Sequence, residues 1–177
     1  MSRRSRLQKT WIALVGILAL SVCSSCVHPS DKQLKVEFHA HKAELEAVVQ
    51  MAQGEESGLN RIADTWACCR VGLLHIYPSD GSALGLSQAR WKRYRQLFAQ
   101  TKTDAGIAIS ADHSQVFFYR SSEGGLGAGS SKGYVYSRKS VAPLIESLER
   151  FRESDCPDRA CMLYEELDKN WFLFFSR

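Results

Sequence analysis

Helix-like and strand-like patterns of hydrophobic residues alternate along this chain of 177 residues. Apolar side chains recur three and four positions apart over residues 32–53 and 87–101, which predicts two amphipathic helices. The same spacing predicts a third helix over residues 141–152, with Pro143 in its first turn. β-branched and aromatic residues dominate several short runs, which we expect to be strands: residues 61–67, 71–77, 106–110, 115–120, 132–137, 161–166 and 171–176.

These elements together predict an α+β fold. A short polar stretch, residues 167–170, separates the last two runs and predicts a closing hairpin, and the final run, WFLFF, lacks alternation, so we expect it to be buried on both faces. We expect a single domain with a mainly antiparallel sheet and two or three packed helices, preceded by an N-terminal helix. The chain then divides into a leader (1–25), a tether with an amphipathic helix (26–54) and a globular domain (55–177). The N-terminal helix either packs on the domain or lifts it as a stalk.

The leader has the composition of a targeting signal. A basic start without acidic residues precedes an apolar run over residues 10–22, and Cys-Ser-Ser-Cys follows. The run is too short to cross ~30 Å of hydrocarbon, which needs ~20 residues. A basic region, a short apolar core and small residues before a cut are typical of a secretory signal. With its cysteines, the segment resembles the signal of bacterial lipoproteins, in which the residue after the cut is a cysteine that receives the lipid.

Two cysteines compete for the lipid under this resemblance. Cys26 follows the small residue Ser25, as the resembling signals require, so we expect the lipid there. Cys23 is the alternative, because Leu20 lies three positions before it, where those signals prefer leucine. Val27 is not the aspartate that retains such proteins at the inner membrane, which favours the outer membrane, facing the periplasm or the exterior. An ordinary secretory signal or an uncleaved anchoring helix would also fit the composition of the leader, although less closely.

The leader also accounts for the net charge. The whole chain has 23 Lys+Arg and 19 Asp+Glu. Without the leader's four basic residues, 19 of each sign remain, so the mature chain is neutral and nucleic acid is not an expected partner. The remaining length and aromatic content are sufficient for one domain with a packed core.

Four cysteines follow the expected anchor. Export would place them in an oxidising compartment, where disulfides persist. We expect Cys156 and Cys161 to pair across their short loop, whereas a bond from either one to Cys68 or Cys69 would be a long-range staple. Adjacent Cys68 and Cys69 would point to opposite faces of a strand. A zinc site is disfavoured because neither pair has the Cys-x2-Cys spacing, and no metal or other cofactor is expected.

A glycine-rich segment, SSEGGLGAGSS, precedes Lys132. Its glycines Gly125, Gly127 and Gly129, with Lys132, form a candidate binding loop, and the alternative is a flexible crossing between two strands. A phosphate-binding loop is disfavoured because Gly133 and an expected strand follow the lysine, where that motif needs Ser or Thr and a helix.

Two further patterns have competing interpretations. The basic run at residues 90–95 contains Trp91 and Tyr94, so it either meets anionic lipid headgroups or forms the solvated side of a helix whose aromatic residues are buried. A thiol enzyme or small hydrolase would need Cys68 or Cys69 beside His75, with the thiol reduced. No catalytic residue is assigned, and catalysis is not the preferred expectation.

A second resemblance covers about the last sixty residues. The order KGYVYS, PLIESLERF and LYEELDKNWFLFF resembles a family of small uncharacterised proteobacterial exported proteins. The resemblance carries no assigned activity and therefore no catalytic residues. We expect a membrane-anchored envelope lipoprotein with a non-catalytic binding or accessory role, for which an envelope protein is a candidate partner.

Overall fold

A computed structural model describes residues 28–55, 61–62, 66–68, 77–78, 86–103, 105–125, 128–151 and 161–177. The leader and its cysteines lie outside these ranges. The elements, in chain order, are α2 (Asp31–Gln53), β1 (Arg61–Ile62), β2 (Trp66–Cys68), β3 (Tyr77–Pro78), α3 (Gln88–Thr101), β4 (Ile107–Ile109), β5 (Gln115–Gly125), β6 (Ala128–Ser137), β7 (Leu144–Ile145), the 3-10 helix η3 (Leu148–Arg150), β8 (Met162–Asp168) and β9 (Trp171–Ser176).

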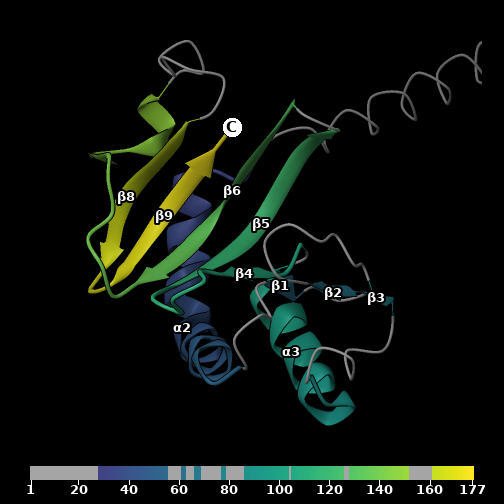
Figure 1. Cartoon of the computed structure of the whole chain (residues 1–177). Coiled ribbons are helices and arrows are strands. Elements are labelled where there is room, and N and C mark those ends of the chain that lie inside the picture. The colour runs from purple at the N-terminus through teal and green to yellow at the C-terminus, as the bar shows by residue number, and fades with distance from the viewer. Residues whose placement is uncertain are drawn as a thin grey trace, which may run out of the picture.

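All of these strands belong to one sheet, ordered β3-β2-β1-β4-β5-β6-β9-β8-β7. Neighbouring strands are antiparallel, except that β7 runs parallel to β8 at one edge. The long strands β5, β6, β9 and β8 form the large twisted part of the sheet, and the short strands β1 to β4 lie near α3 (Figure 1). The predicted α+β fold with a mainly antiparallel sheet is confirmed.

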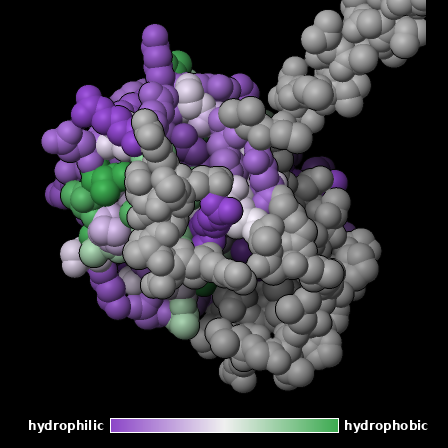
Figure 2. Space-filling model, turned by 90° about the horizontal axis from the view of Figure 1, so that it is seen from above, coloured by the Kyte–Doolittle hydropathy of each residue, from purple (hydrophilic) through white to green (hydrophobic). Residues whose placement is uncertain are grey.

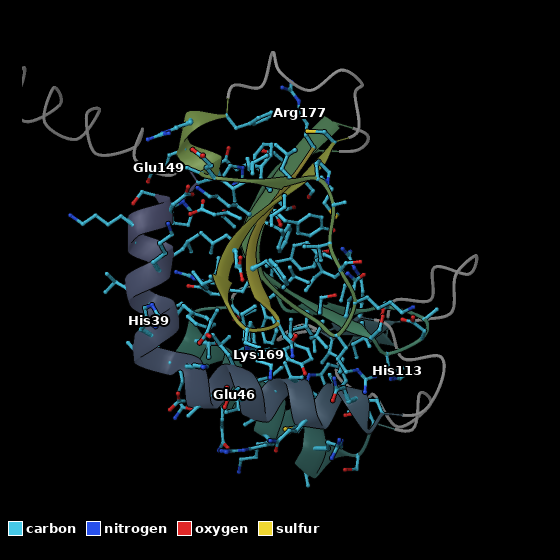
Figure 3. All side chains as sticks on the ribbon, turned by 90° about the vertical axis from the view of Figure 1, so that its left-hand side faces the viewer. His39, Glu46, His113, Glu149, Lys169 and Arg177 are labelled. Carbon is cyan, nitrogen blue, oxygen red and sulfur yellow. The ribbon has the colours of Figure 1, made fainter. Side chains whose placement is uncertain are left out.

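Helix α2 packs on the sheet and is not a stalk. The Ser30 side chain caps its first turn by accepting a hydrogen bond from the Gln33 amide at 3.1 Å. Its apolar stripe is buried, with Leu34 and Phe38 fully covered. The helix bends at His41, where φ is −124° and ψ is 20°. Because of this bend, its first half lies along the long strands and its second half reaches α3 (Figures 1 and 3).

Helix α3 agrees with its sequence pattern. Ser87 caps it by accepting a hydrogen bond from the Arg90 amide at 3.3 Å, and Lys102 ends it in the left-handed conformation with φ of 53°. Its buried stripe includes Trp91 and Tyr94. The stripe is buried because its spacing matches the helical period, which turns these residues to the same side.

The hairpin of β5 and β6 is longer than the sequence predicts. Both strands continue into the glycine-rich segment and pair as far as Gly125 and Ala128. A register shift between Tyr119 and Ser121 makes a β-bulge. Gly133 faces this bulge so closely that an added Cβ would lie 1.9 Å from the Phe118 carbonyl oxygen. Only glycine fits there.

The sheet has apolar side chains on both faces. On the α2 side, the Phe38 ring packs against Tyr134 and Trp171 with centroids 5.9 and 5.3 Å apart. A smaller cluster with Phe174 covers the other face. The final strand is therefore buried on both sides, as its lack of alternation predicts, and the predicted closing hairpin turns at Asn170 with φ of 65°.

The prediction of a third helix over residues 141–152 is wrong. The segment instead forms the edge strand β7 and the 3-10 helix η3. The Tyr164 amide donates a hydrogen bond to the Pro143 carbonyl at 3.1 Å, and the Leu148 amide donates to Glu165 Oε2 at 2.9 Å. Leu144, which a helical stripe would bury, is 51% exposed. The sheet edge and the Glu165 carboxylate satisfy backbone groups that a helix would have paired internally.

Candidate functional site

Charged residues gather where the chain enters the described fold, at the start of α2. This N-terminal cluster consists of His28, Asp31, Lys35, Lys132, Glu149 and Glu165. Asp31, Lys132 and Glu165 are at most 7% exposed, which is unusual for ionised side chains without partners. They come from α2, β6 and β8, so the cluster joins three elements, and Figure 3 shows Glu149 beside the start of α2.

Asp31 and Lys132 form the central ion pair. The Lys132 ammonium lies 2.6 Å from Asp31 Oδ1. Asp31 Oδ2 accepts hydrogen bonds from the Glu149 amide at 2.7 Å and from the Ser147 hydroxyl at 3.4 Å. Burial would raise the pKa of Asp31, but the hydrogen bond and charge of Lys132 outweigh it and hold that pKa below its usual value. Asp31 is therefore ionised in the folded protein at neutral pH.

Glu165 and Glu149 complete the cluster. One Glu165 oxygen pairs with the Lys35 ammonium, and the other accepts the Leu148 amide hydrogen bond. The hydrogen bond to Glu165 raises the pKa of Lys35. Glu149 accepts a hydrogen bond from the Asp31 amide at 2.8 Å, so Asp31 and Glu149 bond to each other's backbone reciprocally. This exchange fixes the start of α2 to η3.

His28 attaches the chain to the β5–β6 hairpin just before α2 begins. Its Nδ1 lies 2.5 Å from the Ser121 hydroxyl and its Nε2 lies 2.7 Å from the Ser130 hydroxyl. The ring also meets Phe175 edge-on, with centroids 5.8 Å apart. A neutral imidazole can donate from one nitrogen and accept at the other, so both contacts form together.

The N-terminal cluster contains residue types that are used in acid–base chemistry. The carboxylate oxygens of Asp31 and Glu165, however, are already bound by other groups of the protein. Each carboxylate oxygen of Asp31 and Glu165 meets an ammonium, amide or hydroxyl group of the protein. Such an arrangement stabilises the junction of α2, β6, β8 and η3. Within the described residues, no group of three or more His, Cys, Asp or Glu side chains is placed to hold a metal ion.

Two half-buried carboxylates, Glu37 and Glu55, hold α2 to neighbouring elements. Glu37 pairs with Lys102 at 2.9 Å and with Arg120 of the β5 bulge at 2.6 Å. Burial opposes ionisation of Glu37, but these hydrogen bonds outweigh it and lower its pKa to about 2. Glu55 lies 2.6 Å from Arg90 and accepts a hydrogen bond from the Tyr94 hydroxyl at 2.7 Å. Burial raises the pKa of Tyr94, and the hydrogen bond to Glu55 raises it further, by a smaller amount.

The candidate binding loop is only partly described. Gly125 ends β5, Gly129 lies in β6, and Gly127 lies outside the described residues. Lys132 lies further along β6, and its ammonium is turned into the N-terminal cluster. The glycine-rich segment is thus the end of a two-stranded hairpin, and the Lys132 side chain is directed to Asp31 and not along this hairpin end.

The cysteines and the thiol-enzyme residues are mostly outside the described ranges. Cys69, His75 and Cys156 lie there, and Cys68 is described only as the end of β2. No two cysteines of the described residues lie at disulfide distance. Cys161 is disulfide-bonded. Cys156 lies outside the described residues, so its pairing with Cys161 remains a prediction.

The basic run on α3 agrees with the solvated-face interpretation. Trp91 and Tyr94 are buried, while Lys92 and Arg93 are exposed. Arg90 turns inward to Glu55 and also donates to the Met51 carbonyl at 2.7 Å, which holds the end of α2. The run therefore contributes to packing between the two helices.

The sequence reasoning missed the N-terminal cluster, although a signal was present. In KGYVY, Lys132 shares a strand face with Tyr134, and in LYEELD, Glu165 shares one with Leu163. A charged residue at a position that faces the core needs a buried partner of opposite charge. Applied to both strands, this rule would have marked Lys132 and Glu165 as buried and paired.

Comparison with protein-family models, with curated proteins and with solved structures gives no match. Among the described helices, none has the length and apolar character needed to cross a membrane.

Proposed function

We propose that this chain is a lipid-anchored protein of a bacterial cell envelope with a non-catalytic binding or accessory role. The observation that carries the proposal is the leader, in which a basic start and a short apolar run end at Ser25-Cys26. Cys26 lies two residues before His28, where the chain is already attached to the sheet. A cut before Cys26 would leave the described fold complete, since α2 begins at Asp31.

The outer membrane is the proposed location, with the domain in the periplasm or outside. Val27 stands where an inner-membrane retention signal would have aspartate. The proposed partner is an envelope protein or a ligand. This role is supported by the use of charge in the described residues. The buried carboxylates Asp31 and Glu165 and the half-buried Glu37 and Glu55 are ion-paired across elements and stabilise the fold.

Mass spectrometry of the full chain expressed in a bacterial host tests the anchor. Cleavage after Lys32 should release a peptide that begins at Cys26 and carries the mass of the acyl groups. Cys26→Ala should abolish the modification and release the protein from the membrane. The matched control, Cys23→Ala, should leave both unchanged. An acyl group on Cys23, or an unmodified N-terminus, would contradict the proposal.

Thiol titration of the same native protein separates the proposed role from the thiol-enzyme alternative. Oxidation of all four cysteines after Cys26 would exclude the thiol enzyme, because its nucleophile needs a free thiol. One reactive thiol of low pKa at Cys68 or Cys69 would instead support the enzyme. A non-reducing tryptic map of the same sample assigns the bond of Cys161, since cleavage after Arg159 separates Cys156 from Cys161.

A further inference from the structure

The short distance between Cys26 and His28 constrains how the domain sits on the membrane. A residue spans at most about 3.6 Å, so the Cα atoms of Cys26 and His28 are at most about 7 Å apart. A lipidated cysteine lies at the bilayer surface. The end of the domain that holds His28 must then lie close to the lipid headgroups.

We propose that the lipid anchor holds one defined end of the domain against the bilayer, with almost no intervening linker. We call this the membrane-proximal end. It consists of the start of α2, the part of the β5–β6 hairpin around Ser121 and Ser130, η3, the first residues of β8 and the last residues of β9. The proposal rests on lipidation of Cys26. Its partner is the headgroup layer of the membrane that carries the anchor.

The attachment of the chain at this end is too extensive to unravel easily. Three of the first four described residues are held by the fold: His28 by two serines, Ser30 by the cap of α2, and Asp31 by the Lys132 ion pair. Releasing Asp31 would break a buried ion pair, which is strongly destabilising when one partner is left behind. The tether therefore cannot lengthen by drawing residues out of the domain.

The exposed residues of this end suit a membrane surface. Lys32, Arg150 and Arg177 are exposed there and can meet headgroup phosphates. Arg150 also lies 3.4 Å from Glu146, so the charge is mixed, and the short tether is what sets the orientation. Figure 2 looks onto this end and shows mainly hydrophilic residues, with a small hydrophobic patch at the left margin of the view. Met162, at the start of β8, is 38% exposed.

The opposite end would then face away from the membrane. Figure 3 shows Glu149 and Arg177 at one end of the molecule and Glu46, Lys169 and His113 toward the other. The turn between β8 and β9 and the second half of α2 belong to this distal end.

Acetylation of native lysines tests the orientation without new side chains. Lys32 lies at the membrane-proximal end, Lys169 lies in the distal turn, and both are exposed. The lipidated protein is reconstituted in vesicles of phosphatidylethanolamine and phosphatidylglycerol and treated with an acetylating reagent. The unlipidated Cys26→Ser chain, mixed with the same vesicles, is the reference. Lys32 should react severalfold more slowly in the anchored protein, while Lys169 and Lys92 on α3 should react equally in both.

A spacer variant tests whether the short tether is the cause. Twenty Gly and Ser residues inserted between Val27 and His28 would have a root-mean-square length of about 25 Å. Lys32 should then react at its unlipidated rate, although the acyl groups remain on Cys26. If Lys32 still reacted slowly in the spacer variant, the short tether would not be the cause of its protection from acetylation.

The outcomes also separate this inference from the proposed function. If the acyl mass is present on Cys26 and Lys32 reacts as fast as in the unlipidated chain, the orientation is wrong and the anchor is right. If the acyl mass is absent or lies on Cys23, the anchor is wrong, and the orientation that depends on it is overturned as well.

Discussion

Replacing Lys132 with methionine tests whether the N-terminal cluster stabilises the fold. The side chains of Lys132 and Asp31 are 9% and 3% exposed, and their charged atoms lie 2.6 Å apart. Methionine keeps most of the length of lysine but has no charge. Asp31 would stay buried, with hydrogen bonds to the Glu149 amide and the Ser147 hydroxyl as its remaining support.

The expected loss follows from leaving one partner of a buried ion pair behind. Such changes lower the free energy of unfolding by about 3–5 kcal/mol. We expect Lys132→Met to lower the free energy of unfolding by about 3 kcal/mol, the lower end of this range, because the two hydrogen bonds to Asp31 Oδ2 remain. The double variant Asp31→Asn, Lys132→Met should recover much of this loss, since no uncompensated charge remains. A slope of about 1–3 kcal/mol per molar urea converts the single-variant loss into a midpoint shift of about 1–3 M.

Urea unfolding at two pH values is the assay, with the disulfides kept oxidised. The lowered pKa of Asp31 in the native protein gives stability that is present above the unfolded value near 3.8 and is lost as the pH falls below it. Without Lys132, burial should raise the pKa of Asp31 above that value. The difference between variant and native protein should therefore be larger at pH 7 than at pH 4. Lys92→Met, on the exposed side of α3, is the matched control and should change stability by at most about 0.5 kcal/mol. A Lys132→Met loss below about 1 kcal/mol that is equal at both pH values would refute the reasoning.

Two further predictions concern the supports of α2 and the β5–β6 hairpin. Gly133→Ala should lower the free energy of unfolding by about 1–3 kcal/mol or more, because its Cβ would overlap the Phe118 carbonyl; in thermal unfolding, Gly54→Ala should be nearly neutral, since its Cβ would have ordinary contacts of 3.6 Å or more. Glu37→Gln should lower the free energy of unfolding by at most about 3 kcal/mol above pH 4.5. The native protein itself loses this contribution as the pH falls from 4.5 toward about 2, so the effect of the substitution should shrink over that range. An equal loss at pH 7 and at pH 3 would show that the charge of Glu37 is not what matters.

The elements with unambiguous local signals could be predicted from the sequence. Ser87 followed by apolar residues at helical spacing defines α3, and the spacing from Leu34 onward defines α2. The unbroken apolar run at Trp171 indicates a strand buried on both faces. In each case the local period and the tertiary environment favour the same structure.

The segment after Pro143 could not be assigned correctly because its local pattern competes with a tertiary one. Leu144, Ile145 and Leu148 have helical spacing, but a short helix in isolation is marginal in water. The edge of β8 offers backbone partners, and Glu165 accepts the Leu148 amide. Neither partner can be identified from the segment itself. The N-terminal cluster could not be predicted for the same reason, because the contact between Asp31 and Glu149 joins residues 118 positions apart.

The packing of α2 depends on strands that are synthesised long after it. The Tyr134 hydroxyl donates to the Leu34 carbonyl across 100 positions, and Phe38 packs against Trp171 in the last strand. At roughly 5–20 residues per second, the ribosome needs on the order of ten seconds to add these strands after α2. Contacts so distant in sequence also form slowly once the chain is complete. Helix α2 is therefore made well before the strands that cover its apolar face, and this face stays uncovered until the C-terminal hairpin has been synthesised.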